Sequence, residues 1–348
     1  GVSGQRVTQG LPARSDMYAS LEDSTRTTAI GGSTITDVTV ASDLTSDITS
    51  TSALTGSAKD YDLLNIIGNG HFSQVWAARH RGSGQMVSLK KVQIFEIMDS
   101  KVRNDCINEV KILQSLDHPH VVKYLDSFIE DNELVIVLEW AEQGDLKRLL
   151  KDRKEKIGQP FFELEIWTYF IQIADALRHM HMRRMMHRDL KPSNILVTGA
   201  GQLKIGDLGL SRYFSSKTMQ AQSVVGTPYY MSPECIRGTP YDWSSDTWSL
   251  GCLLYEITTL NSPFFKDGLT YYTLGKLIGN CQYHPFPPGT PESVKSLVVS
   301  ILQPDPKMRP SVDLICAYAQ AALAGQPPPP GPWGSYRLAD EDEEMSEC

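Results

Sequence analysis

The chain has 348 residues, of which 41% are hydrophobic, and a formal net charge of -8. This length and apolar content suffice for one large folded domain or two small ones. No apolar run approaches the roughly 20 residues that cross a bilayer, and the N-terminus lacks a basic flank followed by an apolar stretch. The excess acid lies near the two ends and no basic stripe lies between them, so neither nucleic acid nor a membrane is expected as a partner.

The six cysteines are scattered along the chain, without a C-x-x-C pair and without histidines at metal-ligand spacing. This distribution predicts neither a disulfide framework nor a structural zinc site. Free thiols are typical of a reducing compartment, so an intracellular protein is expected.

Residues 1–58 are predicted to form a disordered N-terminal tail. The segment is rich in Ser, Thr and Gly, contains no Lys, and shows no sustained hydrophobic period of 2 or 3.6. Such a composition buries too little apolar surface to offset the entropy lost on ordering. A tail that accepts regulatory phosphate groups is compatible with the same composition, so both interpretations stay open.

Residues 326–348 are predicted to form a second tail, with a proline-rich part followed by an acidic part. The tail begins Q-P-P-P-P-G-P-W-G and ends D-E-D-E-E-M-S-E-C. Consecutive prolines favour the extended polyproline II conformation. Four prolines in a row could dock an SH3 or WW domain, but the composition favours a plain solvated linker.

Between the tails, the first part of the chain has a strand pattern. Short apolar or β-branched runs predict five strands, at 63–67, 75–78, 87–92, 121–128 and 134–138. One helix interrupts them, with Asp99 as its expected N-cap. Its apolar face carries Val102, Cys106, Val110 and Leu113.

The second part of the chain has a helix pattern. Apolar residues at steps of three and four predict a helix over 162–180, and a run that is apolar on most sides predicts a buried helix over 243–259. A small sheet-rich lobe therefore precedes a larger helical lobe, and a ligand cleft is expected between them. We predict one α+β domain with two lobes, over residues 59–325, with an N-lobe of 59–139 and a C-lobe of 142–325.

Two groups of residues in the first lobe suit phosphate chemistry. I-I-G-N-G-H-F-S-Q-V-W at 66–76 lies between two predicted strands, and Gly68 and Gly70 let backbone amides approach phosphate oxygens closely. A hairpin turn without a ligand has the same local pattern. Lys90 on the third predicted strand needs a partner because an unpaired buried charge is very costly, and Glu109 is the candidate. A solvent-facing lysine beside a surface glutamate is the alternative.

The string H-R-D-L-K-P-S-N at 187–194, followed by D-L-G, resembles the catalytic motifs of eukaryotic protein kinases. Phosphoryl transfer needs charge neutralisation, in-line positioning and an acceptor for the hydroxyl proton. The resemblance implies that Asp189 accepts or orients this proton and that Lys191 steadies the moving phosphoryl group. It also implies that Asn194 and Asp207 hold magnesium.

Further strings follow in the order that protein kinases have. G-T-P-Y-Y-M-S-P-E at 226–234 resembles the segment that docks a polypeptide substrate, and S-D-T-W-S-L-G at 245–251 resembles the start of the central buried helix. The resemblance implies that Asp246 braces the catalytic loop and that Arg309 pairs with Glu234. It also implies that ATP and Mg2+ are the cofactors and that Lys90 and Glu109 form a catalytic pair.

The same resemblance implies which residues contact the nucleotide. Val75 and Ser88 are expected to cover the adenine, with Leu196 beneath it. The Glu139 carbonyl and the Ala141 amide are expected to face the adenine edge. Ser88 stands where kinases commonly have Ala, and an unpaired buried hydroxyl there would weaken nucleotide binding. The predicted nucleotide set, with Leu138 as the gatekeeper, is Ile67, Gly68, Asn69, Gly70, Ser73, Val75, Ser88, Lys90, Leu138, Glu139, Ala141 and Leu196.

Three strings outside the shared catalytic machinery resemble the NIMA-related kinases, and most closely the short members that are little more than a catalytic domain. They are L-K-K-V-Q-I-F-E-I-M-D at 89–99, F-I-E-D-N-E-L at 128–134 and G-D-L-G-L-S-R-Y-F-S-S-K-T at 206–218. Lys191 and G-T-P-Y-Y are typical of serine/threonine kinases. The resemblance implies roles in mitosis and microtubule organisation, with a location in the cytoplasm, at the centrosome, spindle or microtubules, or in the nucleus.

The resemblance also implies a regulated activation loop. Ser223 stands at the spacing before G-T-P where similar kinases carry an activating serine, and its phosphate is expected to pair with Arg188. Thr227, within G-T-P itself, is a further regulatory residue. The rival phosphorylation sites are Ser215, Ser216 and Thr218. Either an upstream activating kinase or the chain itself supplies the phosphate.

Two other functions compete with an active protein kinase. A pseudokinase scaffold that binds without turnover is the main alternative, but Lys90, Asp189, Asn194 and Asp207 are all retained. A small-molecule phosphotransferase is the second alternative, and the substrate-docking string at 226–234 argues against it. The expected partners are therefore proteins with serine or threonine acceptors. The resemblance to NIMA-related kinases implies a preference for a large apolar residue, often Leu, three positions before the acceptor.

Overall fold

The computed structural model describes residues 56–70, 73–94, 110, 113–207 and 228–335. Glu109, Ser223 and Thr227 lie outside the described residues, as does most of the helix predicted after Asp99.

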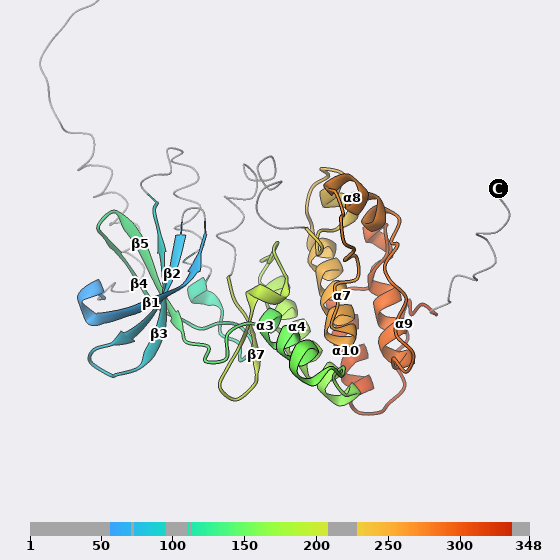
Figure 1. The fold of residues 1–348 in the computed structure, drawn as a ribbon, viewed down its shortest axis with the longest axis horizontal. Helices are drawn as coiled ribbons and strands as arrows, with labels where there is room; N and C mark the ends of the chain where they lie inside the picture. The colour runs from blue at the N-terminus through green and yellow to red at the C-terminus, as the bar shows by residue number, and fades with distance from the viewer. Residues whose placement is uncertain (1–55, 71–72, 95–109, 111–112, 208–227, 336–348) are drawn as a thin grey trace, which may run out of the picture. The chain divides into compact units, whose positions relative to one another are not determined.

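The N-lobe is a five-stranded antiparallel sheet in the order β1-β2-β3-β5-β4, preceded by one short helical turn, η1 (Figure 1). Its elements are η1 (Ala58–Asp60), β1 (Tyr61–Asn69), β2 (Ser73–His80), β3 (Met86–Val92), β4 (Tyr124–Glu130) and β5 (Glu133–Glu139). The five predicted strands are all present. The fourth begins later than predicted because Val121 and Val122 pair with Ile205 in the C-lobe instead.

The two faces of this sheet have different surroundings. Cross-strand pairing places Val75 opposite Lys90, and Ser88 opposite Leu138. Alternate residues of a strand point to the same side, so these four residues share one face. The other face buries the cluster of Tyr61, Ala78, Val87, Leu89, Phe128, Val135 and Val137. The register of β3 therefore fixes the side of the sheet that carries Lys90.

The C-lobe is mainly helical (Figure 1). Its elements are α3 (Leu146–Asp152), η2 (Arg153–Ile157), α4 (Glu163–Met182), η3 (Pro192–Asn194), β6 (Ile195–Val197), β7 (Leu203–Ile205), α6 (Pro233–Ile236), α7 (Trp243–Thr259), α8 (Tyr271–Gly279), α9 (Glu292–Ile301), η4 (Pro306–Met308) and α10 (Val312–Leu323). Both predicted helices are present as α4 and α7. No helix in the described ranges has the length and apolar character needed to cross a membrane.

Helix α7 lies in the centre of the C-lobe, between α4 and α9 (Figure 1). Asp242 caps its N-terminus by accepting the Ser244 amide at 2.8 Å. Trp248 is fully buried and stacks on Phe264 with ring centroids 5.7 Å apart. The carboxylate of Asp246, which is 0% exposed, lies in the first turn of the same helix. The helix that forms the core therefore also carries a buried charge.

Candidate active site

The buried carboxylate of Asp246 holds the backbone of the catalytic loop. It accepts the amides of His187 and Arg188, each at 2.8 Å. His181 Nε2 lies 2.9 Å from the same carboxylate, and the Tyr241 hydroxyl donates to it at 2.5 Å. Burial alone would raise the pKa of Asp246, but these hydrogen bonds hold that pKa below its usual value. The carboxylate therefore stays ionised and fixes the loop.

The buried side chain of His187 connects this loop to the segment that carries Asp207. His187 Nε2 lies 3.1 Å from the carbonyl oxygen of Gly206, and Nδ1 accepts the Asp189 amide at 3.3 Å. This bonding requires the neutral tautomer that is protonated at Nε2. The Gly206 amide in turn donates to the Asn194 carbonyl at 2.8 Å. Direct hydrogen bonds therefore hold the two segments side by side.

Asp189 is oriented by two predicted neighbours. Its Oδ2 atom accepts Lys191 Nζ at 2.7 Å and Asn194 Nδ2 at 3.0 Å, and Asn194 Nδ2 also donates to the Asp189 carbonyl at 2.7 Å. The Asp189 side chain is 36% exposed. The structure thus brings these three residues together and leaves the carboxylate accessible to a substrate hydroxyl.

Lys90 on β3 forms an ion pair with Asp207 of the C-lobe, Nζ to Oδ1. The Lys90 side chain is 11% exposed and the Asp207 side chain is 45% exposed. The Lys90 charge lowers the pKa of Asp207. Glu109, the partner predicted for Lys90, lies outside the described residues. The ion pair joins two predicted site residues from different lobes directly.

Asn194 and Asp207 fit a magnesium site by the chemistry of their side chains. Mg2+ prefers oxygen ligands and is usually held by one or two carboxylates together with substrate phosphates. Asn194 Nδ2 is engaged by Asp189, which leaves the side-chain oxygen of Asn194 as its ligand atom. Within the described ranges, no group of three or more His, Cys, Asp or Glu could hold a metal by itself. The site therefore suits a metal that arrives with phosphate oxygens.

The predicted nucleotide residues lie on the N-lobe sheet, on the connection between the lobes and on β6. They lie on or next to β1 and β2 (Ile67, Gly68, Asn69, Gly70, Ser73, Val75), on β3 (Ser88, Lys90), on or just after β5 (Leu138, Glu139, Ala141) and on β6 (Leu196). The hairpin of β1 and β2 is closed by a bond from the Gly70 amide to the Ser73 carbonyl at 2.7 Å. A Cβ atom at Gly70 would lie 2.8 Å from Ser73 Oγ, so a larger residue there would require the Ser73 hydroxyl to rotate away.

The side chain of Glu139 ties the connection between the lobes to two other elements. Its Oε1 atom accepts the Lys123 amide at 2.6 Å and Lys204 Nζ at 2.7 Å. The sequence indicated Glu139 only through its backbone carbonyl and missed both lysines. Lys204 lies 65 residues further along the chain, so no local pattern connects the pair. Only a prediction of how β7 lies against β5 could have found it.

Ser88→Ala is expected to lower the KM for ATP about two- to tenfold, the net value of one hydrogen bond, with kcat unchanged. The Ser88 hydroxyl is buried and donates at 3.3 Å to the Glu139 carbonyl, the group predicted to bind the adenine edge. The expectation of an unpaired hydroxyl is therefore wrong, and the hydroxyl is instead expected to compete with the adenine for this carbonyl. Steady-state kinetics with varied ATP check the prediction. Ser127→Ala, at a buried serine on β4, is the control, and an unchanged or higher KM in Ser88→Ala contradicts the prediction.

Glu234 in the predicted substrate-docking segment forms the expected pair with Arg309. Two hydrogen bonds of 2.8 Å join the guanidinium to the carboxylate, and the Arg309 side chain is 0% exposed. Burial alone would raise the pKa of Glu234, but Arg309 and the Ser245 hydroxyl lower it to about 2. The pair anchors the short helix α6 to the segment before α10.

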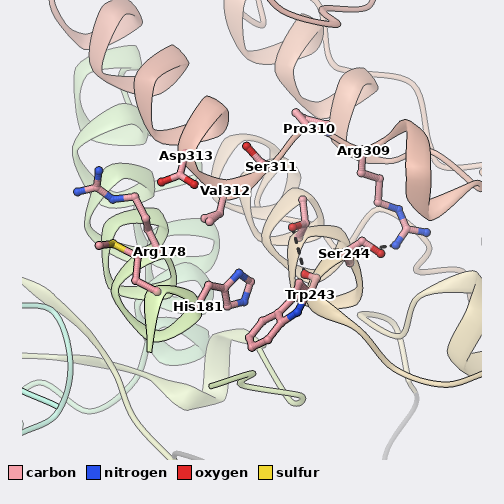
Figure 2. A pocket seen from close by; sticks show the side chains of 11 residues that line it. Arg178, His181, Trp243, Ser244, Arg309, Pro310, Ser311, Val312 and Asp313 are labelled. Atoms are coloured by element: carbon pink, nitrogen blue, oxygen red, sulfur yellow. Dashed lines mark hydrogen bonds between the residues drawn. The ribbon is translucent and has the colours of Figure 1, made fainter. Parts of the chain in front are cut away.

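A pocket of about 420 Å³ lies between α4, the start of α7 and the segment that leads into α10 (Figure 2). The His181 ring forms part of its wall, with its centroid 5.0 Å from that of Trp243. None of the predicted catalytic, metal or nucleotide residues lines this pocket. The pocket is therefore separate from those residues. Two of its lining residues support the site, since His181 contacts Asp246 and Arg309 pairs with Glu234.

A two-lobed fold with this arrangement of Lys90, Asp189 and Asp207 defines a protein kinase. Residues 61–320 match the protein kinase domain family, so the chain belongs to that family. The family uses ATP with Mg2+, which confirms the predicted cofactors. The same match, together with the sheet of the N-lobe and the helices of the C-lobe, confirms the predicted α+β fold.

The relatives place the chain more narrowly. It is 37% identical over 260 residues to serine/threonine-protein kinase nekl-2 of Caenorhabditis elegans, covering 73% of this chain and 72% of that protein. It is 40% identical over 257 residues to probable serine/threonine-protein kinase nek3 of Dictyostelium discoideum, and 36% identical over 259 residues to human serine/threonine-protein kinase Nek5. The chain belongs to the NIMA-related serine/threonine protein kinases, which confirms the predicted family. It spans only 22% and 35% of the latter two relatives.

Proposed function

We propose that the chain transfers the γ-phosphoryl group of ATP to serine or threonine side chains of protein substrates. The ion pair between Lys90 and Asp207 is the observation that carries this proposal. It brings the cation expected to bind phosphate within reach of the carboxylate expected to bind metal. A scaffold without turnover has no need for this juxtaposition, because both charges act on the reacting phosphate.

The residues of the site have distinct tasks in this reaction. Bound ATP with Mg2+ supplies the transferable phosphoryl group and neutralises much of its charge. Asp189, held by Lys191 and Asn194, orients the substrate hydroxyl and accepts its proton. Asn194 and Asp207 would hold the metal. Lys90 would exchange its contact with Asp207 for a phosphate oxygen.

The full chain, incubated with labelled ATP, Mg2+ and an arrayed serine/threonine peptide library, tests this function. We expect labelled peptides to carry a large apolar residue, often Leu, three positions before the acceptor. Asp189→Asn is the control, because an amide side chain cannot accept the proton. Labelling by Asp189→Asn equal to that by the wild type, or no labelling by either, overturns the proposal. An absolute requirement for arginine at the third position before the acceptor contradicts the proposed preference.

Membership of the NIMA-related kinases supports a proposed role in mitosis and in spindle and microtubule organisation. The corresponding location is the cytoplasm, the centrosome, the spindle or microtubules, or the nucleus. Imaging of the tagged full chain through the cell cycle tests this proposal. A signal that never meets centrosomes, spindle or microtubules at any stage would contradict the proposed role.

We propose that phosphorylation of Ser223, by an upstream kinase or by the chain itself, activates the enzyme. Arg188 supports this proposal through its position. Its backbone amide is fixed by Asp246 at 2.8 Å and it directly precedes Asp189. A phosphate carries about -1.5 to -2 charges at neutral pH and pairs well with a guanidinium. A phosphate bound by Arg188 would therefore act on the backbone that positions Asp189.

Ser223→Ala is expected to reduce activity about tenfold or more relative to the fully phosphorylated wild type. That factor corresponds to roughly one charge-assisted hydrogen-bond interaction of 1.5–3 kcal/mol. Peptide phosphorylation rates, with sites mapped by mass spectrometry, provide the measurement. Ser215→Ala is the matched control within the same loop. Full activity in Ser223→Ala, with phosphate confined to Ser215, Ser216 or Thr218, would exclude Ser223 as the switch.

A further inference from the structure

The proline-rich segment 326–335 is held against the C-lobe at both ends. At its start, the Gln326 amide donates at 2.8 Å to a carbonyl of α10. Near its far end, the Gly334 amide donates to Ser300 Oγ and the Gly334 carbonyl accepts Ser296 Oγ, both at 2.7 Å. Both serines belong to α9, which lies beside α10 (Figure 1). The segment therefore differs from the solvated linker that its composition favours.

Trp333 is the main anchor of this segment. Its ring meets Tyr318 of α10 edge-on, with centroids 4.6 Å apart, and packs against the main hydrophobic core. Its Nε1 atom donates to the Pro329 carbonyl at 2.5 Å, so the indole also folds back over its own segment. Aromatic edge-to-face pairs contribute roughly 0.5–1.5 kcal/mol beyond their burial. One side chain thus fixes both the position and the bend of the segment.

Two glycines make room for the Trp333 anchor. A Cβ atom at Gly331 would lie 2.5 Å from the Trp333 ring, and one at Gly334 would lie 2.7 Å from Val299 Cγ1 on α9. A side chain at Gly331 would therefore displace the Trp333 ring, and one at Gly334 would require Val299 or the segment itself to shift. In the string G-P-W-G at 331–334, Trp333 makes the contact with the C-lobe, and Gly331 and Gly334 leave space for it.

The anchored segment presents prolines to solvent on one edge. Pro327, Pro328 and Pro330 are exposed, whereas Pro329 is half-buried and its carbonyl is taken by Trp333. Residues that precede proline favour an extended backbone, so the stretch before the bend at 330–331 suits polyproline II. That helix has three residues per turn. A polyproline II conformation that reaches the bend would place Pro327 and Pro330 on one exposed edge and Pro329 on a different one.

We propose that the edge formed by Pro327 and Pro330 is a docking ridge for a protein module with a groove lined by aromatic side chains. Such grooves bind P-x-x-P segments in the polyproline II conformation. The described part of the segment, 326–335, contains no charged residue, so recognition depends on proline rings and backbone carbonyls. Because both ends are held by the C-lobe, the ridge loses less conformational freedom on binding than a free peptide does.

Binding of the immobilised full chain to an array of purified SH3, WW and EVH1 domains tests this ridge. We expect at least one domain to bind, and the double variant Pro327→Ala/Pro330→Ala to weaken that binding about tenfold or more. Pro332→Ala, in the same segment but beyond the bend, is the matched control and should change the affinity less than about twofold. Absence of binding by every domain, or equal losses in the double variant and the control, overturns the proposal.

The contribution of the anchor is measured separately. A synthetic peptide of residues 326–335 and the variant Trp333→Phe should each bind the same domain about three- to tenfold more weakly than the full chain. The peptide comparison does not depend on whether Trp333→Phe folds. If the peptide and the full chain bind the domain with equal affinity, the fold does not hold the ridge in its binding conformation. Peptide phosphorylation should be unchanged in the proline variants, so this test is independent of the proposed kinase activity.

Discussion

Lys90→Met is expected to lower kcat/KM by about 10²–10³ while leaving the protein folded. The Lys90 side chain is 11% exposed, and methionine fills a similar volume without a charge. The expected loss therefore arises from the phosphate contact and not from packing. Circular dichroism and thermal unfolding establish that the variant is folded. Rates of peptide phosphorylation at varied ATP concentration measure the loss in kcat/KM for ATP.

Lys91→Met is the matched control for this variant. Lys91 is the next residue on β3 and therefore lies on the opposite face, where its Nζ atom is 3.7 Å from Glu133. The Lys91→Met variant loses one positive charge from β3, as Lys90→Met does, and should retain nearly full activity. A rate for Lys90→Met within tenfold of wild type, or equal losses in the two variants, would contradict the role of Lys90.

Asp207→Ala extends this prediction to the other half of the ion pair. It should lose activity to the same extent, because both residues act on one phosphate and its metal. It should also unfold more easily than Lys90→Met, because the largely buried Lys90 charge then lacks its partner. The double variant should be no less active than either single variant, since residues that act as a unit are not additive.

The catalytic residues could be predicted because each lies within a short string. Asp189, Lys191 and Asn194 fall within six residues of sequence and contact one another directly. The partner of Lys90 could not be chosen in the same way. A buried lysine requires a carboxylate, but the pattern around Lys90 does not say which one, and Asp207 lies 117 residues away. The contact depends on how the lobes meet.

The fold shows the same division between local and long-range information. Alternation and apolar runs predicted β3 and β5 to within one or two residues, and the apolar run at 243–259 predicted α7 over its full length. These predictions succeed because burial of one or all sides of an element leaves a direct hydrophobic pattern in the sequence. Trp333 leaves no such pattern. Its position depends on spaces at Gly331 and Gly334 that only the packed structure reveals. Composition alone therefore favoured a solvated segment.

Arg309→Met is expected to lower the free energy of unfolding by about 3–5 kcal/mol, the usual cost of breaking a buried ion pair. Arg309 makes two hydrogen bonds to Glu234 and also donates to the carbonyls of Gln303 and Ser244, each at 2.9 Å. Its guanidinium lies 5.0 Å from the centroid of Trp248 in the central helix. The variant leaves the buried Glu234 carboxylate without its cation, so the loss exceeds that of a surface pair.

The pH dependence of unfolding distinguishes this cause from a general packing defect. The pKa of Glu234 is about 2 in the folded protein and 4.5 is its ordinary value, so its contribution is fully present above pH 4.5 and is lost as the pH falls toward 2. Without Arg309, burial raises this pKa above 4.5, and protonation stabilises the variant as the pH falls from 7 to 5. Burial raises the pKa of Glu256 to about 7, so both proteins gain stability between pH 7 and pH 5 from that group. Urea unfolding at these two pH values should therefore show a larger gain for Arg309→Met than for the wild type.

Two further variants complete this test. Glu234→Gln combined with Arg309→Met should recover part of the lost stability and remove the extra gain between pH 7 and pH 5, because neither position then carries a charge. Lys307→Met removes an exposed charge two residues before Arg309 and should change the free energy of unfolding by less than about 0.5 kcal/mol. If Arg309→Met unfolds within about 1 kcal/mol of the wild type at pH 7, the ion pair does not hold α6 in place, since breaking a buried pair costs several times that amount.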